Sequence, residues 1–182
     1  MKAWIIAGGL MLASTSLSLA DTTTPPPPAA QASPPPNLDC PGAAYRQFDF
    51  MLGKWNVGPT AKPDRPSKSE WVKLSPCAIL EQWRPKSGYK GFSINYYDQA
   101  DNKWHQHWMD ATGDATDYVG EWANGKLVFT ADDVVTPQIQ DVKLTMTFEL
   151  LPSGDVRQSG TMSTDGGKTW QPAFDLTYTP EP

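Results

Sequence analysis

The sequence predicts an all-β protein: an antiparallel up-and-down barrel of about eight to ten strands with a short N-terminal helix. Apolar and polar residues alternate with a period of two over long stretches. Turn-forming residues separate these stretches at short intervals. Substantial side chains occupy both faces of the central strands, which a closed barrel with a lined cavity explains better than a sandwich with one wet face.

Two segments precede the predicted domain in this chain of 182 residues. Residues 1–20 have the basic start, apolar run and small residues of an export signal, with cleavage expected after Ala20. The apolar run is well short of the ~20 residues that span a bilayer. Residues 21–39 form a proline-rich linker, expected to be extended and disordered. The barrel domain is therefore expected over residues 40–182, in an exported protein that is periplasmic or extracellular and has no transmembrane segment after cleavage.

A short helix is expected first, over residues 43–52, followed by ten strands. In the clearest strand, Val142 and Leu144 alternate with Lys143 and Thr145, so one face is core and the other is wet. The strands are expected near residues 54–58, 67–75, 78–85, 89–97, 103–110, 116–123, 126–131, 139–150, 155–163 and 169–179.

Hairpin turns separate several of these strands. Four short segments are rich in Asp, Asn, Gly or Pro, which favour tight turns: residues 98–102, Asn124-Gly125, residues 152–155 and residues 165–167. Consecutive strands should therefore be antiparallel neighbours.

The register of the predicted hairpin over residues 89–110 determines which side chains share a face of the sheet. If Tyr97 pairs with Trp104, one face presents Ser93, Asn95, Tyr97, Trp104, Gln106, Trp108 and Asp110. The other face presents Phe92, Ile94, Tyr96, His105, His107 and Met109. Neither set resembles an ordinary solvent-facing surface, so we expect the first to line a cavity.

Charge and cysteine content limit the partners. The formal net charge is −5, with 15 Lys and Arg against 20 Asp and Glu. Too few basic residues are present to neutralise a phosphate lattice, which argues against nucleic acid. Cys40 and Cys77 are the only cysteines, and in an exported protein a disulfide between them is expected.

Polar and aromatic side chains on the predicted inner faces form the candidate ligand-binding site. Its residues are Glu81, Trp83, Ser93, Asn95, Trp104, Gln106, Trp108, Asp110 and Arg157. Trp83, Trp104 and Trp108 would supply aromatic walls, and the polar groups would orient a ligand or bond only to one another. Arg157, on a later strand, could pair with Glu81 or Asp110, or hold an anionic head group.

No catalytic residue is assigned, and enzymatic activity stays open. His105 and His107 share a strand face with Met109, a pattern that can bind zinc or copper. The alternative is a pair of surface or packing histidines. No Gly-x-Ser-x-Gly elbow is present.

Residues 163–170 match the Ser-x-Asp-x-Gly-x-Thr-Trp pattern of propeller blades, in a single copy. A structural turn is expected here, in which Ser163 and Asp165 bond backbone amides and Trp170 packs over the hairpin.

Residues 48–57, which contain Gly53-x-Trp55, resemble the opening of lipocalin-like (calycin) barrels. Together with residues 91–98 and 104–110, they resemble an uncharacterised family of exported bacterial proteins in that group. The resemblance covers about residues 40–180 and implies a barrel whose closed end is plugged by the Trp, with a small-ligand pocket and no activity to transfer. The chain is distantly similar to nitrobindin-type barrels, which bind haem, but it has no His in its last strands.

The leading hypothesis is an exported barrel that binds a small apolar or amphipathic molecule and needs no cofactor. A haem- or metal-dependent enzyme that uses His105 or His107 is the second. The third is an envelope interaction module with a filled interior. Nothing in the sequence indicates an oligomeric state.

Overall fold

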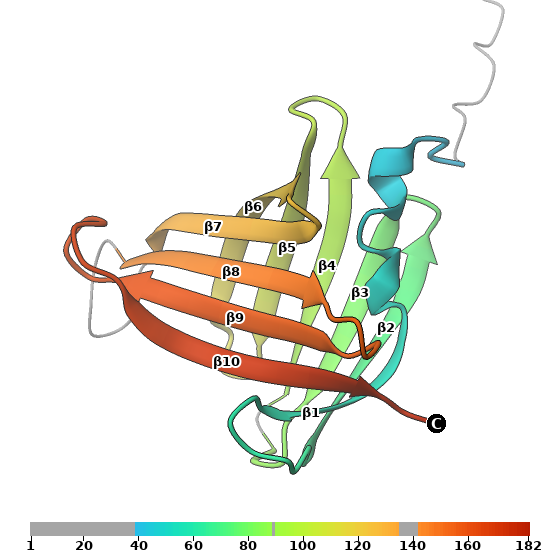
Figure 1. Cartoon of the computed structure of the whole chain (residues 1–182). Coiled ribbons are helices and arrows are strands. Elements are labelled where there is room, and N and C mark those ends of the chain that lie inside the picture. The colour runs from blue at the N-terminus through green and yellow to red at the C-terminus, as the bar shows by residue number, and fades with distance from the viewer. Residues whose placement is uncertain (1–38, 89, 135–141) are drawn as a thin grey trace, which may run out of the picture. The chain divides into compact units, whose positions relative to one another are not determined.

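The computed structural model describes residues 39–88, 90–134 and 142–182, with the backbone alone at Asp133. These residues form a closed barrel of ten antiparallel strands preceded by two short helices (Figure 1). The predicted all-β up-and-down barrel is therefore confirmed, and the sandwich is excluded. The predicted export signal and nearly all of the predicted linker lie outside the described residues. No helix in the described ranges is long and apolar enough to cross a membrane.

The element order follows the prediction closely. The 3₁₀ helices are η1 (Ala43–Arg46) and η2 (Asp49–Met51). The strands are β1 (Gly53–Pro59), β2 (Ser67–Ser75), β3 (Ala78–Arg84), β4 (Gly91–Asp98), β5 (Lys103–Asp110), β6 (Ala115–Ala123), β7 (Lys126–Val134), β8 (Val142–Leu150), β9 (Val156–Ser163) and β10 (Gln171–Pro180). Each predicted strand coincides with one of these to within three residues at every described end.

Each strand pairs with its neighbours in the chain, and β1 pairs with β10 to close the barrel. Closure leaves no open sheet edge in the barrel wall, which removes the unpaired backbone groups that promote edge-to-edge association.

The predicted register of the β4–β5 hairpin is confirmed. Tyr97 pairs with Trp104, and Asn95 pairs with Gln106. Ser93, Asn95 and Gln106 are buried, so this face points into the barrel. Phe92, on the opposite face, is 39% exposed.

The predicted N-terminal helix consists of two 3₁₀ turns. They are separated at Phe48, whose backbone (φ −103°, ψ 4°) departs from helical values. This break directs the Phe48 ring into one end of the barrel, where it is fully buried. Its ring centroid lies 4.9 Å from that of Phe148, 5.3 Å from Trp71 and 5.6 Å from Trp104. The rings meet edge to face, as aromatic quadrupoles favour.

Two indole groups hold the 3₁₀ turns to the barrel. Trp55 Nε1 donates to the Met51 carbonyl oxygen at 2.7 Å, and Trp104 Nε1 donates to Gln47 Oε1 at 3.0 Å. Trp55 therefore packs at the junction of η2 and β1, while Phe48 occupies the centre of the aromatic cluster. We call the end of the barrel that is filled by Phe48, Trp71, Trp104 and Phe148 the closed end.

The predicted disulfide between Cys40 and Cys77 is confirmed. It joins the start of the described chain to the β2–β3 turn, across a sequence separation of 37 residues. In the chain-entropy model a crosslink of this span contributes roughly 3 to 4 kcal/mol by restricting the unfolded chain.

The turn between β9 and β10 has the structure expected from its motif. Asp165 Oδ1 accepts from the backbone N–H groups of Lys168 and Thr169, at 3.0 and 2.9 Å. Ser163 Oγ accepts from the Gly167 N–H at 2.8 Å. Hydrogen bonds, those from Thr169 foremost, lower the pKa of Asp165 to about 2. The motif therefore serves to build a turn.

Replacing Phe48 by Ala should destabilise the barrel by about 3–5 kcal/mol, because it empties the centre of the closed end. Urea unfolding followed by circular dichroism measures this. Phe92→Ala, on the outer face, is the matched control and should cost under about 1 kcal/mol. Equal losses in the two variants would contradict a central role for Phe48.

Candidate functional site

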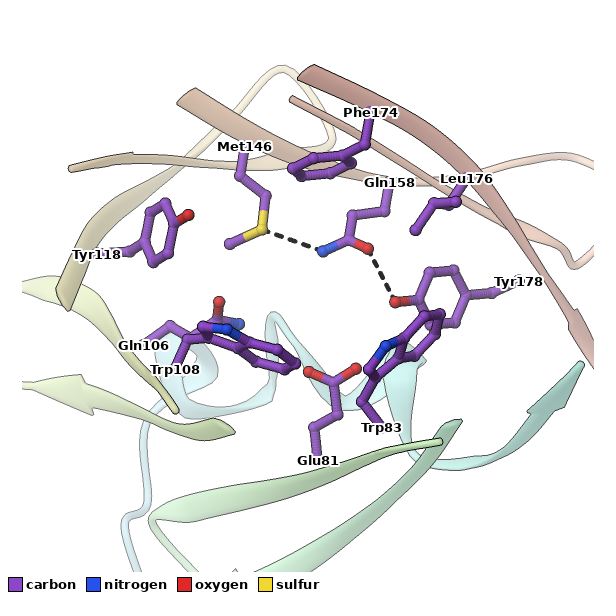
Figure 2. Close-up of a pocket in the computed structure, with 10 residues that line it drawn as sticks. All are labelled: Glu81, Trp83, Gln106, Trp108, Tyr118, Met146, Gln158, Phe174, Leu176 and Tyr178. Atoms are coloured by element: carbon purple, nitrogen blue, oxygen red, sulfur yellow. Dashed lines mark hydrogen bonds between the residues drawn. The ribbon is translucent and has the colours of Figure 1, made fainter. Parts of the chain in front are cut away.

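A cavity of about 310 Å³ lies inside the barrel, and none of the rings that pack on Phe48 lines it (Figure 2). Strands from around the barrel contribute to it. The lining residues are Glu81, Trp83, Gln106, Trp108, Tyr118, Met146, Gln158, Phe174, Leu176 and Tyr178.

The cavity has a polar inner layer and an apolar outer layer. Glu81 and Gln106 are each 3% exposed and form part of the inner layer. Trp83 follows Glu81 on β3, and Trp108 follows Gln106 on β5, each two residues further along its strand. Both indoles are only partly buried, as expected of side chains near an opening.

A chain of hydrogen bonds supports the Glu81 carboxyl group from behind. Ser69 Oγ donates to Oε1 at 3.0 Å, and Ser93 Oγ donates to Oε2 at 2.9 Å. Asn95 Nδ2 donates to Ser93 Oγ at 2.9 Å, and Gln106 Nε2 donates to Asn95 Oδ1 at 2.7 Å. The pairing of β3, β4 and β5 places these groups opposite one another. Buried polar groups thereby find partners.

Burial raises the pKa of Glu81 to about 7, and the hydrogen bonds from Ser93 and Ser69 oppose part of that rise. None of the ion pairs found among the described residues includes Glu81. The buried carboxyl group therefore has no cationic partner among the described residues, and its charge changes near neutral pH.

The opposite wall carries a second, smaller network. Tyr178 donates its hydroxyl to Gln158 Oε1 at 2.8 Å, and Gln158 Nε2 contacts Met146 Sδ at 3.0 Å (Figure 2). Burial, followed by the negative charge of Glu81, raises the pKa of Tyr178 well above its ordinary value. Burial raises the pKa of Tyr118 to about 12. Both tyrosines therefore stay protonated and uncharged at physiological pH.

Two aromatic walls of the cavity rest on glycines. A Cβ atom on Gly91 would lie 2.4 Å from the Trp108 ring, and one on Gly160 would lie 2.5 Å from the Phe174 ring. Each ring occupies space that any other residue would fill, so the glycines fix where these walls stand.

The structure brings four of the predicted site residues to the cavity: Glu81, Trp83, Gln106 and Trp108. Ser93 and Asn95 lie behind it, in the network that holds Glu81.

The other three predicted site residues lie elsewhere. Trp104 belongs to the closed end, beside Phe48. Asp110 Oδ1 accepts from the Thr112 N–H at 2.8 Å and shapes the β5–β6 turn. Arg157 forms a bidentate pair with Asp175 at 2.9 and 2.7 Å. It points outward because its neighbour Gln158 points inward, so the expected pairing with Glu81 or Asp110 is wrong.

Sequence reasoning missed six lining residues: Tyr118, Met146, Gln158, Phe174, Leu176 and Tyr178. The alternation of Phe174, Leu176 and Tyr178 marks them as one face, but does not separate cavity wall from solid core. Gln158 lies two residues after the apolar Val156, so alternation along the strand places its polar side chain on the inner face. That alternation is the sequence signal by which Gln158 could have been predicted.

The two histidines lie on the outer face of β5 and have separate partners. His105 Nε2 bonds Asp101 Oδ2 at 2.9 Å, and its ring stacks on Tyr96. His107 Nδ1 bonds Asp117. Donor atoms of Asp98, Asp101 and His105 lie within 4.8 Å of one another and could hold a metal ion. Such a site would use His105 with carboxylates, without His107.

Comparison of the chain with known protein families finds no match, and a search of curated proteins also finds none. The comparisons therefore give no family for this chain. We infer the function of the protein from its cavity.

The difference in unfolding free energy between wild type and Glu81→Gln should depend on pH. The folded protein holds the Glu81 proton up to about pH 7, whereas the unfolded chain releases it near the ordinary value of 4.5. Wild-type stability should therefore fall by about 3 kcal/mol relative to the variant as the pH rises through this window, and then level off.

Urea titrations at pH 4, 5.5, 7 and 8 measure this difference. Glu70→Gln, on the outer face of β2 beside Lys54, is the matched control and should keep the wild-type pH dependence. A constant difference between wild type and Glu81→Gln would refute the upward shift.

Proposed function

We propose that this protein is an exported small-molecule-binding barrel whose cavity takes a small apolar or amphipathic ligand. The observation that carries the proposal is the cavity of about 310 Å³ with a polar inner layer and an aromatic outer layer. Its volume lies at the low end of ligand pockets, which range over about 300–1,000 Å³.

The chemistry of the lining supports a binding role. Trp83, Trp108 and Phe174 offer large rigid surfaces, and Leu176 extends the apolar wall. Polar groups are placed at fixed points of this lining, Glu81 and Gln106 on one wall and Gln158 and Tyr178 on the opposite wall, as in sites that fix the orientation of a largely apolar ligand. Glu81 is the charged group among them when ionised.

The cavity also distinguishes this role from a solid interaction module. A filled barrel would leave voids no larger than a water molecule, whose share of liquid volume is about 30 Å³. The observed cavity of about 310 Å³, which is open on one side, is far larger than such a void. A cavity of this size favours a ligand-binding barrel over a barrel with a filled interior.

Export and a relationship to calycin barrels belong to the same proposal. The Cys40–Cys77 disulfide supports an oxidising compartment. The short helical turns before Gly53-x-Trp55, and the barrel that follows them, support the lipocalin-like relationship.

Binding of N-phenyl-1-naphthylamine, a neutral apolar fluorophore, tests the proposal. Wild-type protein should bind it with a saturable rise and blue shift of probe emission. Leu176→Trp, which adds volume inside the cavity, should weaken probe binding at least tenfold.

Leu74→Trp is the matched control, because it makes the same substitution at a side chain on the outer face of β2 that is 55% exposed. It should bind the probe like wild type. Equal probe binding by all three proteins would show that the probe binds outside the cavity and would count against the proposed function.

A further inference from the structure

The charge of the cavity limits which ligands it can accept. Its ten lining residues include one carboxyl group, Glu81, and no Lys, Arg or His. Arg157, the cation expected to hold an anionic head group, is paired with Asp175 on the outer surface. Among the described residues Glu81 has no cationic partner, so an anionic ligand would meet its charge without compensation, whereas a cationic ligand would supply the missing partner.

The Glu81 carboxyl group has acceptor capacity left for a ligand. It accepts one hydrogen bond on each oxygen, from Ser69 and Ser93. An ionised carboxylate offers about four lone-pair sites, so about two remain. Figure 2 shows both oxygens directed into the cavity, between the indoles of Trp83 and Trp108.

The two indoles suit a cation as well as an apolar chain. An ammonium group within about 6 Å of an indole centroid is attracted by the ring quadrupole, most strongly where water is excluded. A carboxylate flanked by indoles can therefore bind an ammonium group and the methylene or methyl groups attached to it.

We propose that the cavity selects organic amines, with the ligand ammonium paired to Glu81 between Trp83 and Trp108 and its apolar part against Phe174 and Leu176. This inference rests on the proposed function, because it names the ligand class of the same cavity. The ammonium donates hydrogen bonds to Oε1 and Oε2, so no covalent step is involved.

Titration of Glu81 should control this binding. Two other titratable groups line the cavity, Tyr178 on β10 and Tyr118 on β6, and both stay protonated over the range tested. On the strands beside Glu81, the neighbouring inward groups Ser69 and Ser93 do not titrate. The pKa of about 7 for free Glu81 then predicts a roughly thirtyfold loss of amine affinity from pH 8 to pH 5.5.

Three ligands that share one skeleton isolate the effect of charge: 3-phenylpropylamine, 3-phenylpropanol and 3-phenylpropanoate. Isothermal titration calorimetry at pH 8 should show the amine binding at least tenfold more tightly than the alcohol, with the carboxylate weakest. Between pH 8 and pH 5.5 the amine affinity should fall and the alcohol affinity should stay within twofold.

Substitutions then assign the effect to residues. Glu81→Gln should lower amine affinity at least tenfold and leave the alcohol within twofold. Glu70→Gln should change neither. Trp108→Leu should weaken the amine more than the alcohol, and it keeps the test decisive if Glu81→Gln does not fold.

The outcomes separate this inference from the proposed function. If the alcohol and N-phenyl-1-naphthylamine bind, but the amine binds no more tightly and is insensitive to Glu81→Gln and Trp108→Leu, amine selectivity is overturned and small-molecule binding stands. If neither the three ligands nor the fluorophore bind, the proposed function itself fails.

Discussion

Packing of Phe48 inside the barrel is the interaction on which the rest of the structure depends. The ring reaches the barrel from the segment before β1 and meets Trp71, Trp104 and Phe148. These rings fill the closed end, whereas the rest of the interior holds the cavity, whose lining combines polar groups with the rings of Trp83, Trp108 and Phe174.

The polar inner layer of the cavity lies where the filled closed end gives way to the cavity. Glu81 lies two residues beyond the buried Ile79 on β3, so its carboxyl group stands where β3 passes from packed core to cavity. Hydrogen bonds from Ser69 and Ser93 hold it there. Burial at this boundary keeps the group desolvated, and the open side of the cavity leaves it accessible to a small molecule. The position of Glu81 along β3 therefore determines both the raised pKa of its carboxyl group and the access of a small molecule to it.

Sequence periodicity predicted the strands and the β4–β5 register because both depend on local alternation and turn chemistry. It also placed Glu81, Gln106 and Trp108 on the inner face. It could not separate Trp104, which packs on Phe48, from Trp108, which lines the cavity, because both share one parity. Arg157 was misplaced although alternation along β9 sets its direction: Val156 and Gln158 are buried, so Arg157 between them points outward. Long-range closure, which alternation does not encode, brings Gln158 and Tyr178 opposite Glu81.

The glycines beneath Trp108 and Phe174 have a consequence for how this barrel can diversify. The rings stand where they do because Gly91 and Gly160 have no methyl group to displace them. Substitutions at these two positions would displace the rings and change the size of the cavity without replacing Glu81. A change at Gly160 would act on the Phe174 wall, whereas a change at Gly91 would also move Trp108, the ring beside Glu81, and so would alter the size of the cavity and the surroundings of its carboxyl group together.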